Sequence, residues 1–219
     1  YNKEFIHLKQ KGKIYKRAEI LGLITRDVFT IAIAGTHGKT TITSMIAHIL
    51  KSAGKDVFSF MGGISKNYRT NLLLSEKNTI AVVEADEFDR SFLQLHPDIA
   101  VISSMDADHL DIYGDKNYMI ESYRMFANQV KPCGKLFLKK NLVLDNIQTK
   151  VLNYSKNEAT DFFASDVQVK NVKFYFTINT NTGEKIIVES GVPGFHNVEN
   201  ATVASAVSLS MGVSPKTIA

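Results

Sequence analysis

The residue types best suited to chemistry first appear in one loop of this sequence, Gly35-Thr36-His37-Gly38-Lys39-Thr40-Thr41. An apolar run at residues 28–33 precedes the loop, and a run with helical apolar spacing follows it. Strand, glycine loop and helix in this order present backbone N–H groups and a helix N-terminus to a phosphate. Lys39 would then reach the β- and γ-phosphates, and the Thr40 hydroxyl would bind Mg²⁺. The loop predicts a nucleotide site, with Ile33 in place of the first glycine of the usual G-x-x-x-x-G-K-[ST] motif.

A second group of candidate residues begins at Glu84, which closes the apolar run at residues 80–83. A carboxylate at this point is well placed to hold Mg²⁺ directly or through water. The alternative is a plain helix cap, a role that Asp86 or Glu87 could also fill. Given the glycine loop upstream, the metal role is the favoured interpretation for Glu84.

A third group lies at residues 106–111, where Asp106, Asp108, His109 and Asp111 bring four ionisable groups into six positions. A role in the core explains such a group poorly, so a second Mg²⁺ or a phosphate is the predicted ligand, with His109 acting partly through water. All three groups follow predicted strands. Ligands of parallel sheets bind beyond the carboxyl ends of the strands, so the three groups are expected to converge at one edge.

Asn197 and Asn200 lie three residues apart near the start of a predicted helix, on one face of it. Their amides can contact an adenine edge, but asparagine near a helix start is also an ordinary cap. Spacing alone leaves both interpretations open.

The elements that position these residues alternate along most of the chain. Apolar runs predict strands at 28–34, 56–61, 79–83, 98–103 and 135–138, and helical spacing predicts helices at 40–53, 117–130 and 196–211. This order indicates an α/β fold with a mostly parallel sheet flanked by helices. Alternating polar and apolar residues at 162–169, 172–179 and 185–190 predict a small antiparallel β flap at the sheet edge.

Composition narrows the class of partner. The 219 residues carry a net charge of +4, with lysines spread along the chain and densest at residues 9–17. A solvated face explains that stretch better than a nucleic-acid arm, so no nucleic acid is expected. No apolar run reaches 18 residues, and therefore no membrane span is expected. The single cysteine, Cys133, fits a reducing cytoplasm.

Five segments together resemble the Mur ligase family, ATP-dependent amide-forming enzymes of peptidoglycan synthesis: residues 34–41, 62–67, 84–92, 108–114 and 194–201. The resemblance implies a P-loop NTPase-like central ATP-binding domain over residues 28–219. Residues 1–27 resemble the tail and linker of a UDP-binding N-terminal domain, and the family's C-terminal domain is expected to be absent.

The resemblance also implies roles for particular residues. Lys39 contacts the phosphates, and Thr40, Glu84 and His109 hold metal. The adenine pocket is expected to be lined by His196, Asn197 and Asn200. The segment that faces the sugar nucleotide is expected to include Asp86, Glu87 and Arg90.

One position departs from several family members, which carry a carbamylated lysine on the helix after the Asp-His motif. That position falls at Tyr123 here, which cannot be carbamylated in this way. The departure favours the branch of the family that joins L-alanine to UDP-N-acetylmuramate, through an acyl phosphate made with ATP and Mg²⁺. Lys39→Ala is then expected to remove most ATP turnover while the fold persists.

Two alternatives stay open. The first is a family member that recycles a murein tripeptide, which shares the early motifs. A folylpolyglutamate-synthase-like ligase is less favoured, because the loop with His37 and residues 86–90 fit it poorly. A non-enzymatic module switched by ATP would explain the glycine loop but not the Asp-His group.

Overall fold

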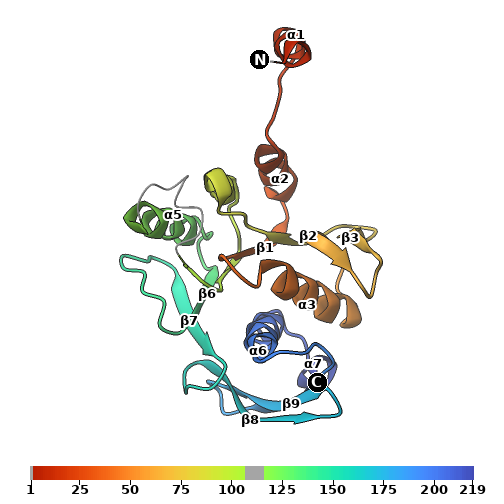
Figure 1. The fold of residues 1–219 in the computed structure, drawn as a ribbon, viewed down its shortest axis with the longest axis vertical. Helices are drawn as coiled ribbons and strands as arrows, with labels where there is room; N and C mark the ends of the chain where they lie inside the picture. Colours follow the sequence, from red (N-terminus) through yellow and green to blue (C-terminus); the bar gives the residue numbers. More distant parts are fainter. Residues whose placement is uncertain (1, 107–115) are drawn as a thin grey trace.

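The computed structural model describes residues 2–106 and 116–219, whose strands form one sheet of ten (Figure 1). The strands in chain order are β1 (Phe29–Ala34), β2 (Val57–Ser65), β3 (Thr70–Leu73), β4 (Ile80–Glu84), β5 (Ile99–Ile102), β6 (Lys135–Lys139), β7 (Lys150–Ser155), β8 (Phe162–Lys170), β9 (Lys173–Thr180) and β10 (Lys185–Ser190). The order across the sheet is β10-β9-β8-β7-β6-β5-β1-β4-β2-β3. The helices are α1 (Lys3–Lys11), α2 (Arg17–Thr25), α3 (Lys39–Ser52), the 3-10 segment η1 (Phe88–Gln94), α5 (Lys116–Asn128), α6 (Phe195–Ser210) and α7 (Pro215–Ile218).

The sheet is mostly parallel, as the sequence predicts. The seven strands from β2 to β8 across the sheet pair in parallel, whereas β3 is antiparallel at one edge and β9 and β10 are antiparallel at the other. The predicted flap is confirmed, but it continues the main sheet, because β8 pairs in parallel with β7.

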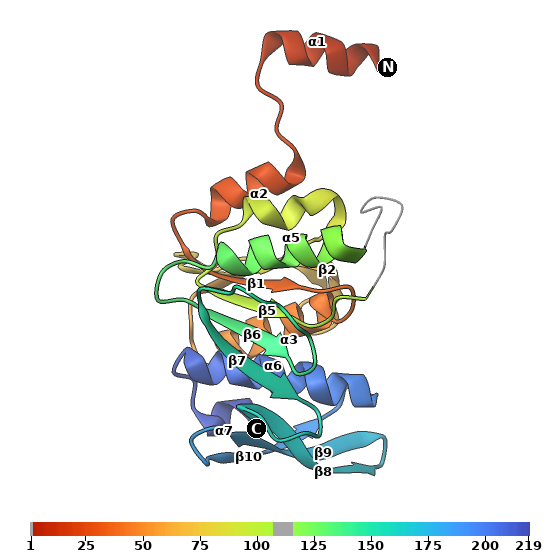
Figure 2. The same cartoon turned by 90° about the vertical axis from the view of Figure 1, so that its left-hand side faces the viewer.

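The two faces of the sheet are covered by different helices (Figure 2). Side chains of β1 alternate between them: Ile31 and Ile33 join the core that includes α3 and α6, and Ala32 and Ala34 join the core that includes α5 and η1. The α3–α6 core also takes in apolar side chains of the flap, so α6 is covered by β8 and β9. Period-two alternation in a buried strand produces this two-sided packing.

The structure differs from the sequence-based prediction at β2, β3, β7 and α1. The strand predicted to end at residue 61 runs on to Ser65, through Gly62 and Gly63. The short β3 and β7, which has only two large apolar residues in sequence positions 151–152 before Asn153, have too weak an apolar pattern to be predicted. The helix α1 has no buried residue and projects away from the body (Figure 1), and its apolar side chains Phe5, Ile6 and Leu8 are exposed.

Candidate nucleotide-binding site

The strands β5, β1 and β4 are neighbours, so their carboxyl ends lie at one edge of the sheet, where the glycine loop and Glu84 were predicted to converge. The loop after β1 turns through left-handed backbone at Gly35 (φ +129°) and Gly38 (φ +87°). A β-carbon on Gly35 would lie 2.3 Å from Ser103 Oγ and 2.8 Å from the Ser104 nitrogen. Glycine is therefore required at position 35 both by its φ and by the approach of the chain after β5.

Two serines that the sequence analysis did not single out shape this loop. The Ser104 hydroxyl accepts a hydrogen bond of 2.8 Å from the His37 N–H, and the Ser103 hydroxyl donates to the His37 carbonyl. The exposed His37 imidazole lies 3.7 Å from the Asp106 carboxylate. Ser103 and Ser104 directly follow a buried strand, and side chains that follow neighbouring parallel strands meet at one edge of the sheet. Their position in the sequence could therefore have marked them as site residues.

Lys39 begins α3 and turns its ammonium back over the loop. It donates to the Gly35 carbonyl at 2.8 Å and to both carboxylate oxygens of Glu87 at 2.9 Å. The side chains of Lys39 and Glu87 are only 18% and 5% exposed. The structure thus brings together a residue predicted to bind phosphate and one predicted to face a sugar nucleotide, a pairing that sequence spacing does not reveal.

Glu84 and Thr40 both border the paired glycines of β2. The Glu84 carboxylate accepts a hydrogen bond from the Gly62 N–H, and a β-carbon on Gly62 would lie 2.7 Å from Glu84 Oε2. A β-carbon on Gly63 would lie 3.5 Å from the Thr40 methyl group. Gly62 leaves room beside the half-buried Glu84 carboxylate, and the half-buried Thr40 carries a hydroxyl. Both groups are oxygen donors that suit Mg²⁺.

The segment after β4 has an unusual backbone. Asp89 and Arg90 both take left-handed φ values, 52° and 53°, which are uncommon for residues with a side chain. The Asp89 carboxylate is held by Lys16 at 2.8 Å. This ion pair lowers the pKa of Asp89 and raises the pKa of Lys16.

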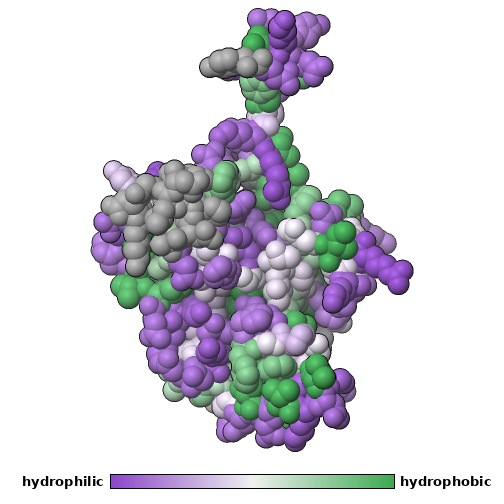
Figure 3. Space-filling view, in the orientation of Figure 1, coloured by the Kyte–Doolittle hydropathy of each residue, from purple (hydrophilic) through white to green (hydrophobic). Residues whose placement is uncertain are grey.

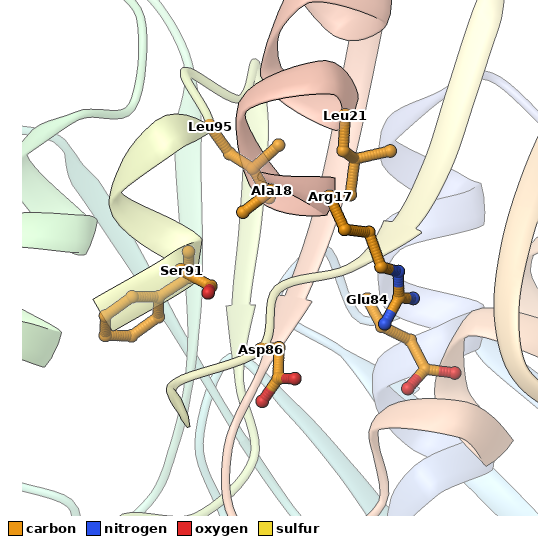
Figure 4. A pocket seen from close by; sticks show the side chains of 8 residues that line it. Arg17, Ala18, Leu21, Glu84, Asp86, Ser91 and Leu95 are labelled. Atoms are coloured by element: carbon orange, nitrogen blue, oxygen red, sulfur yellow. The ribbon is translucent and has the colours of Figure 1, made fainter. Parts of the chain in front are cut away.

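A pocket lies between α2 and the end of β4 (Figure 4), lined by Arg17, Ala18, Leu21, Glu84, Asp86, Ser91, Phe92 and Leu95. Arg17 extends from α2 toward the acidic side chain of Glu84 in this view, and Asp86 lies farther from it. The exposed Asp86 accepts a hydrogen bond from the Phe88 N–H. The pocket lining therefore includes the guanidinium of Arg17 and the carboxylates of Glu84 and Asp86. Arg17 was not among the predicted site residues.

The start of α6 approaches the glycine loop from the other face. Asn197 donates to the Pro193 carbonyl at 2.6 Å, and Asn200 donates to Asn197 Oδ1 at 3.0 Å. A β-carbon on Gly38 would lie 2.9 Å from Asn200 Oδ1, so this amide touches the glycine loop. Both asparagines are buried, whereas His196 is exposed. The two amides thus link α6 to the loop that contains Pro193 and to the glycine loop, which is more than a helix cap does.

An ion pair ties α6 to the end of β6: Lys139 Nζ lies 2.9 Å from Glu199 Oε2. Behind it, the Tyr154 hydroxyl donates to the Ile102 carbonyl at 3.3 Å. Burial raises the pKa of Tyr154 well above its ordinary value, and the Glu199 carboxylate adds to the shift. Tyr154 therefore stays protonated and serves as a donor in the core.

The predicted metal residue His109, with Asp108 and Asp111, lies outside the described residues. Within residues 2–106 and 116–219, no group of three His, Cys, Asp or Glu side chains is arranged to hold a metal ion. Tyr123, at the position of the carbamylated lysine, is fully buried and packs edge-on against Phe92, with ring centroids 5.4 Å apart. It is a core residue of the α5 face.

Hydrophilic residues cover most of the face seen in Figure 3, including α1. Among the helices that the structure describes, none combines the length and apolar character required to cross a membrane.

A glycine loop after a central strand, with an acidic residue at the end of the neighbouring strand, is the arrangement typical of nucleotide-binding α/β domains. The model of the Mur ligase middle domain matches residues 33–208, and the chain belongs to this family.

Curated relatives extend the comparison. The chain is 44% identical over 212 residues to proteins named UDP-N-acetylmuramate--L-alanine ligase from Flavobacterium psychrophilum and Flavobacterium johnsoniae. These matches cover 97% of this chain and 46% of each relative, so the chain spans about half the length of the curated relatives it matches.

Solved structures share the fold. A murein peptide ligase from Psychrobacter arcticus superposes with a TM-score of 0.82 at 24% identity, covering 100% of this chain and 51% of that one. The UDP-N-acetylmuramate-alanine ligase MurC from Thermotoga maritima gives 0.78 at 23% identity, covering 92% and 46%. The MurF ligase from Thermotoga maritima in complex with ADP gives 0.72 at 18%, covering 95% and 53%.

Proposed function

We propose that this chain is the ATP-binding central domain of an enzyme that joins L-alanine to UDP-N-acetylmuramate, with ATP converted to ADP and phosphate. The observation that carries the nucleotide part is the glycine loop at the carboxyl end of β1, beside Glu84 at the end of β4. The choice of substrates is supported by the names of relatives that are 44% identical over nearly all of this chain.

The proposed reaction has two steps. An oxygen of the muramyl carboxylate attacks the γ-phosphorus of ATP, which releases ADP and forms an acyl phosphate. The amine of L-alanine then attacks the acyl carbon, loses a proton and displaces inorganic phosphate, leaving an amide. A free carboxylate is a poor electrophile, and phosphorylation supplies its leaving group.

The chain's own residues would act mainly by position and charge. Backbone N–H groups of the loop from Gly35 to Thr41 and the Lys39 ammonium would bind phosphate oxygens. His196, Asn197 and Asn200 would border the adenine, since Asn200 touches Gly38. The exposed side chains of Asp86 and Arg90 would face the sugar nucleotide.

Mg²⁺ belongs to this proposal, with Thr40, Glu84 and His109 as its holders. The fit rests on the space that Gly62 leaves beside the Glu84 carboxylate. When bound, the ion would neutralise charge on the phosphate oxygens. A cytoplasmic location is part of the same proposal and is compatible with the single cysteine, Cys133.

ADP formation by the full-length protein tests the proposal. The assay contains ATP and Mg²⁺, with and without UDP-N-acetylmuramate, across L-alanine, glycine, L-serine and the tripeptide. ADP is expected only when the sugar nucleotide and L-alanine are both present. A preference for the tripeptide would favour a recycling ligase, and ADP formation without either substrate would favour an ATP-driven switch.

A further inference from the structure

The Lys39 ammonium has its hydrogen-bonding capacity fully used within the protein. An ammonium group has three N–H donors. The Gly35 carbonyl and the two carboxylate oxygens of Glu87 supply three acceptors at 2.8, 2.9 and 2.9 Å. A phosphate oxygen that binds Lys39 must therefore replace one of these acceptors.

Of these acceptors, Glu87 is the one whose displacement from Lys39 would also move the segment of backbone that carries it. The Gly35 carbonyl belongs to a loop packed against the chain that follows β5, where a β-carbon on Gly35 would lie 2.3 Å from Ser103 Oγ. The Glu87 carboxylate is 5% exposed, and a buried carboxylate is costly once its cation is withdrawn. Loss of a Lys39 bond thus favours movement of the Glu87 side chain and of the backbone that carries it.

That backbone is the segment at residues 86–90, which the proposed function assigns to the sugar nucleotide. It contains the left-handed residues Asp89 and Arg90, a conformation that persists only when neighbouring contacts hold it. Lys39 contacts it through Glu87, and Lys16 contacts it through Asp89. The segment is therefore held between the phosphate loop and α2.

We propose that Glu87 is a positioning residue that competes with nucleotide phosphates for the Lys39 ammonium, so that phosphate binding repositions residues 86–90. The link between this competition and the sugar nucleotide rests on the proposed function. Because coupling between two ligands is reciprocal, a ligand that binds residues 86–90 also changes nucleotide affinity through Glu87.

The test measures the affinity of the full-length protein for the Mg²⁺ complex of a non-hydrolysable ATP analogue, without sugar nucleotide. Glu87→Gln preserves the side-chain shape but removes the charge that holds Lys39. We expect binding to tighten about ten-fold, equivalent to about 1.4 kcal/mol. Glu189→Gln is the matched control, since Glu189 pairs with Lys173 in the flap and its loss should leave the affinity unchanged.

A double-variant cycle separates competition from simple repulsion between Glu87 and the phosphates. In a Lys39→Ala background, Glu87→Gln should have no effect on nucleotide affinity. Equal tightening with and without Lys39 would mean that repulsion alone acts, and would overturn the proposal. Unchanged or weaker binding by Glu87→Gln in the presence of Lys39 would overturn it as well.

Two further readouts complete the test. If Glu87→Gln does not fold, as judged by thermal unfolding, Glu87→Asp takes its place, because its shorter carboxylate cannot hold Lys39 in the same way. Adding UDP-N-acetylmuramate should change the analogue affinity of the unaltered protein but not that of Glu87→Gln. If the sugar nucleotide has no effect on either protein while the cycle gives the expected result, the proposed substrate fails and the competition stands.

Discussion

The carboxylate of Glu84 accepts a hydrogen bond from the Gly62 N–H, and a β-carbon on Gly62 would lie 2.7 Å from Glu84 Oε2. Gly62 is thus both the partner of the proposed metal residue and the reason that its carboxylate has room. The glycine lies inside β2, where it would otherwise weaken the strand. The space that the Glu84 carboxylate needs explains why a glycine lies at position 62.

The first prediction follows from this contact. Gly62→Ala should displace the Glu84 carboxylate and lower ADP formation about 10- to 100-fold, because small misplacements of catalytic groups are costly. The Mg²⁺ concentration for half-maximal rate should rise. Gly63→Ala is the comparison: its β-carbon would meet the Thr40 methyl at an ordinary 3.5 Å, so most activity should remain. Equal losses in both variants would contradict this account of Gly62.

The second prediction concerns the stability of the phosphate loop. Gly35→Ala adds a β-carbon at positive φ and a clash with Ser103, so the free energy of unfolding should fall by about 3 kcal/mol. Gly183→Ala shares the positive φ, at +83°, but has nothing within 4 Å. Its cost should be about 1 kcal/mol. Urea unfolding of the two full-length variants measures the difference, and equal costs would show that the Ser103 contact is unimportant.

The third prediction modifies an expectation drawn from the sequence. Lys39→Ala should abolish ATP turnover, but it also withdraws the cation from the buried Glu87 carboxylate. The free energy of unfolding should therefore fall by about 3 kcal/mol, the scale for breaking a buried pair. Adding Glu87→Gln should restore most of that stability without restoring turnover. A Lys39→Ala protein as stable as the unaltered one would show that the pair is not formed.

The fourth prediction concerns Tyr123, where several family members carry a carbamylated lysine. Its buried ring packs against Phe92, so Tyr123→Ala should lower the free energy of unfolding by about 3 to 5 kcal/mol. Tyr118→Ala on the same helix is the control, since that side chain is 60% exposed and should cost little. Comparable effects in urea unfolding would argue against a core role for Tyr123.

The fifth prediction is a pH dependence at the contact between α2 and the segment after β4. Because Lys16 lowers the pKa of Asp89, the pair stabilises the folded state above the ordinary aspartate value near 4. That contribution is lost as pH falls through the lowered pKa of the folded state. In an NMR titration, Lys16→Met should raise the pKa of Asp89 toward its ordinary value. The pKa of Glu189, which Lys173 lowers in the flap, should not change.

The sequence predicted the parts of this fold that depend on local patterns. Continuous apolar runs identified β1, β4 and β5, and because their ends must meet in a parallel sheet, the approach of Glu84 to the glycine loop was predictable. The extension of β2 through Gly62 was not, since paired glycines usually signal a turn. Only the position of the Glu84 side chain explains Gly62.

The contacts of Glu87 could not be predicted either. The family resemblance placed Glu87 among the residues after β4 that were expected to face the sugar nucleotide. Its carboxylate instead points back to Lys39, 48 residues earlier in the chain. Side-chain direction in a segment with left-handed residues does not follow a strand or helix period, so the pattern rules that located Glu84 fail three residues later.

Transfer of oxygen from the carboxylate to phosphate tests the central claim most directly. The full-length protein is given UDP-N-acetylmuramate labelled with ¹⁸O in its carboxylate, together with ATP, Mg²⁺ and L-alanine, and the inorganic phosphate is analysed by mass spectrometry. An acyl-phosphate route predicts one carboxylate ¹⁸O in each phosphate released. Phosphate without the label would mean that water attacks ATP, and would contradict the assignment of this chain to an acyl-phosphate ligase.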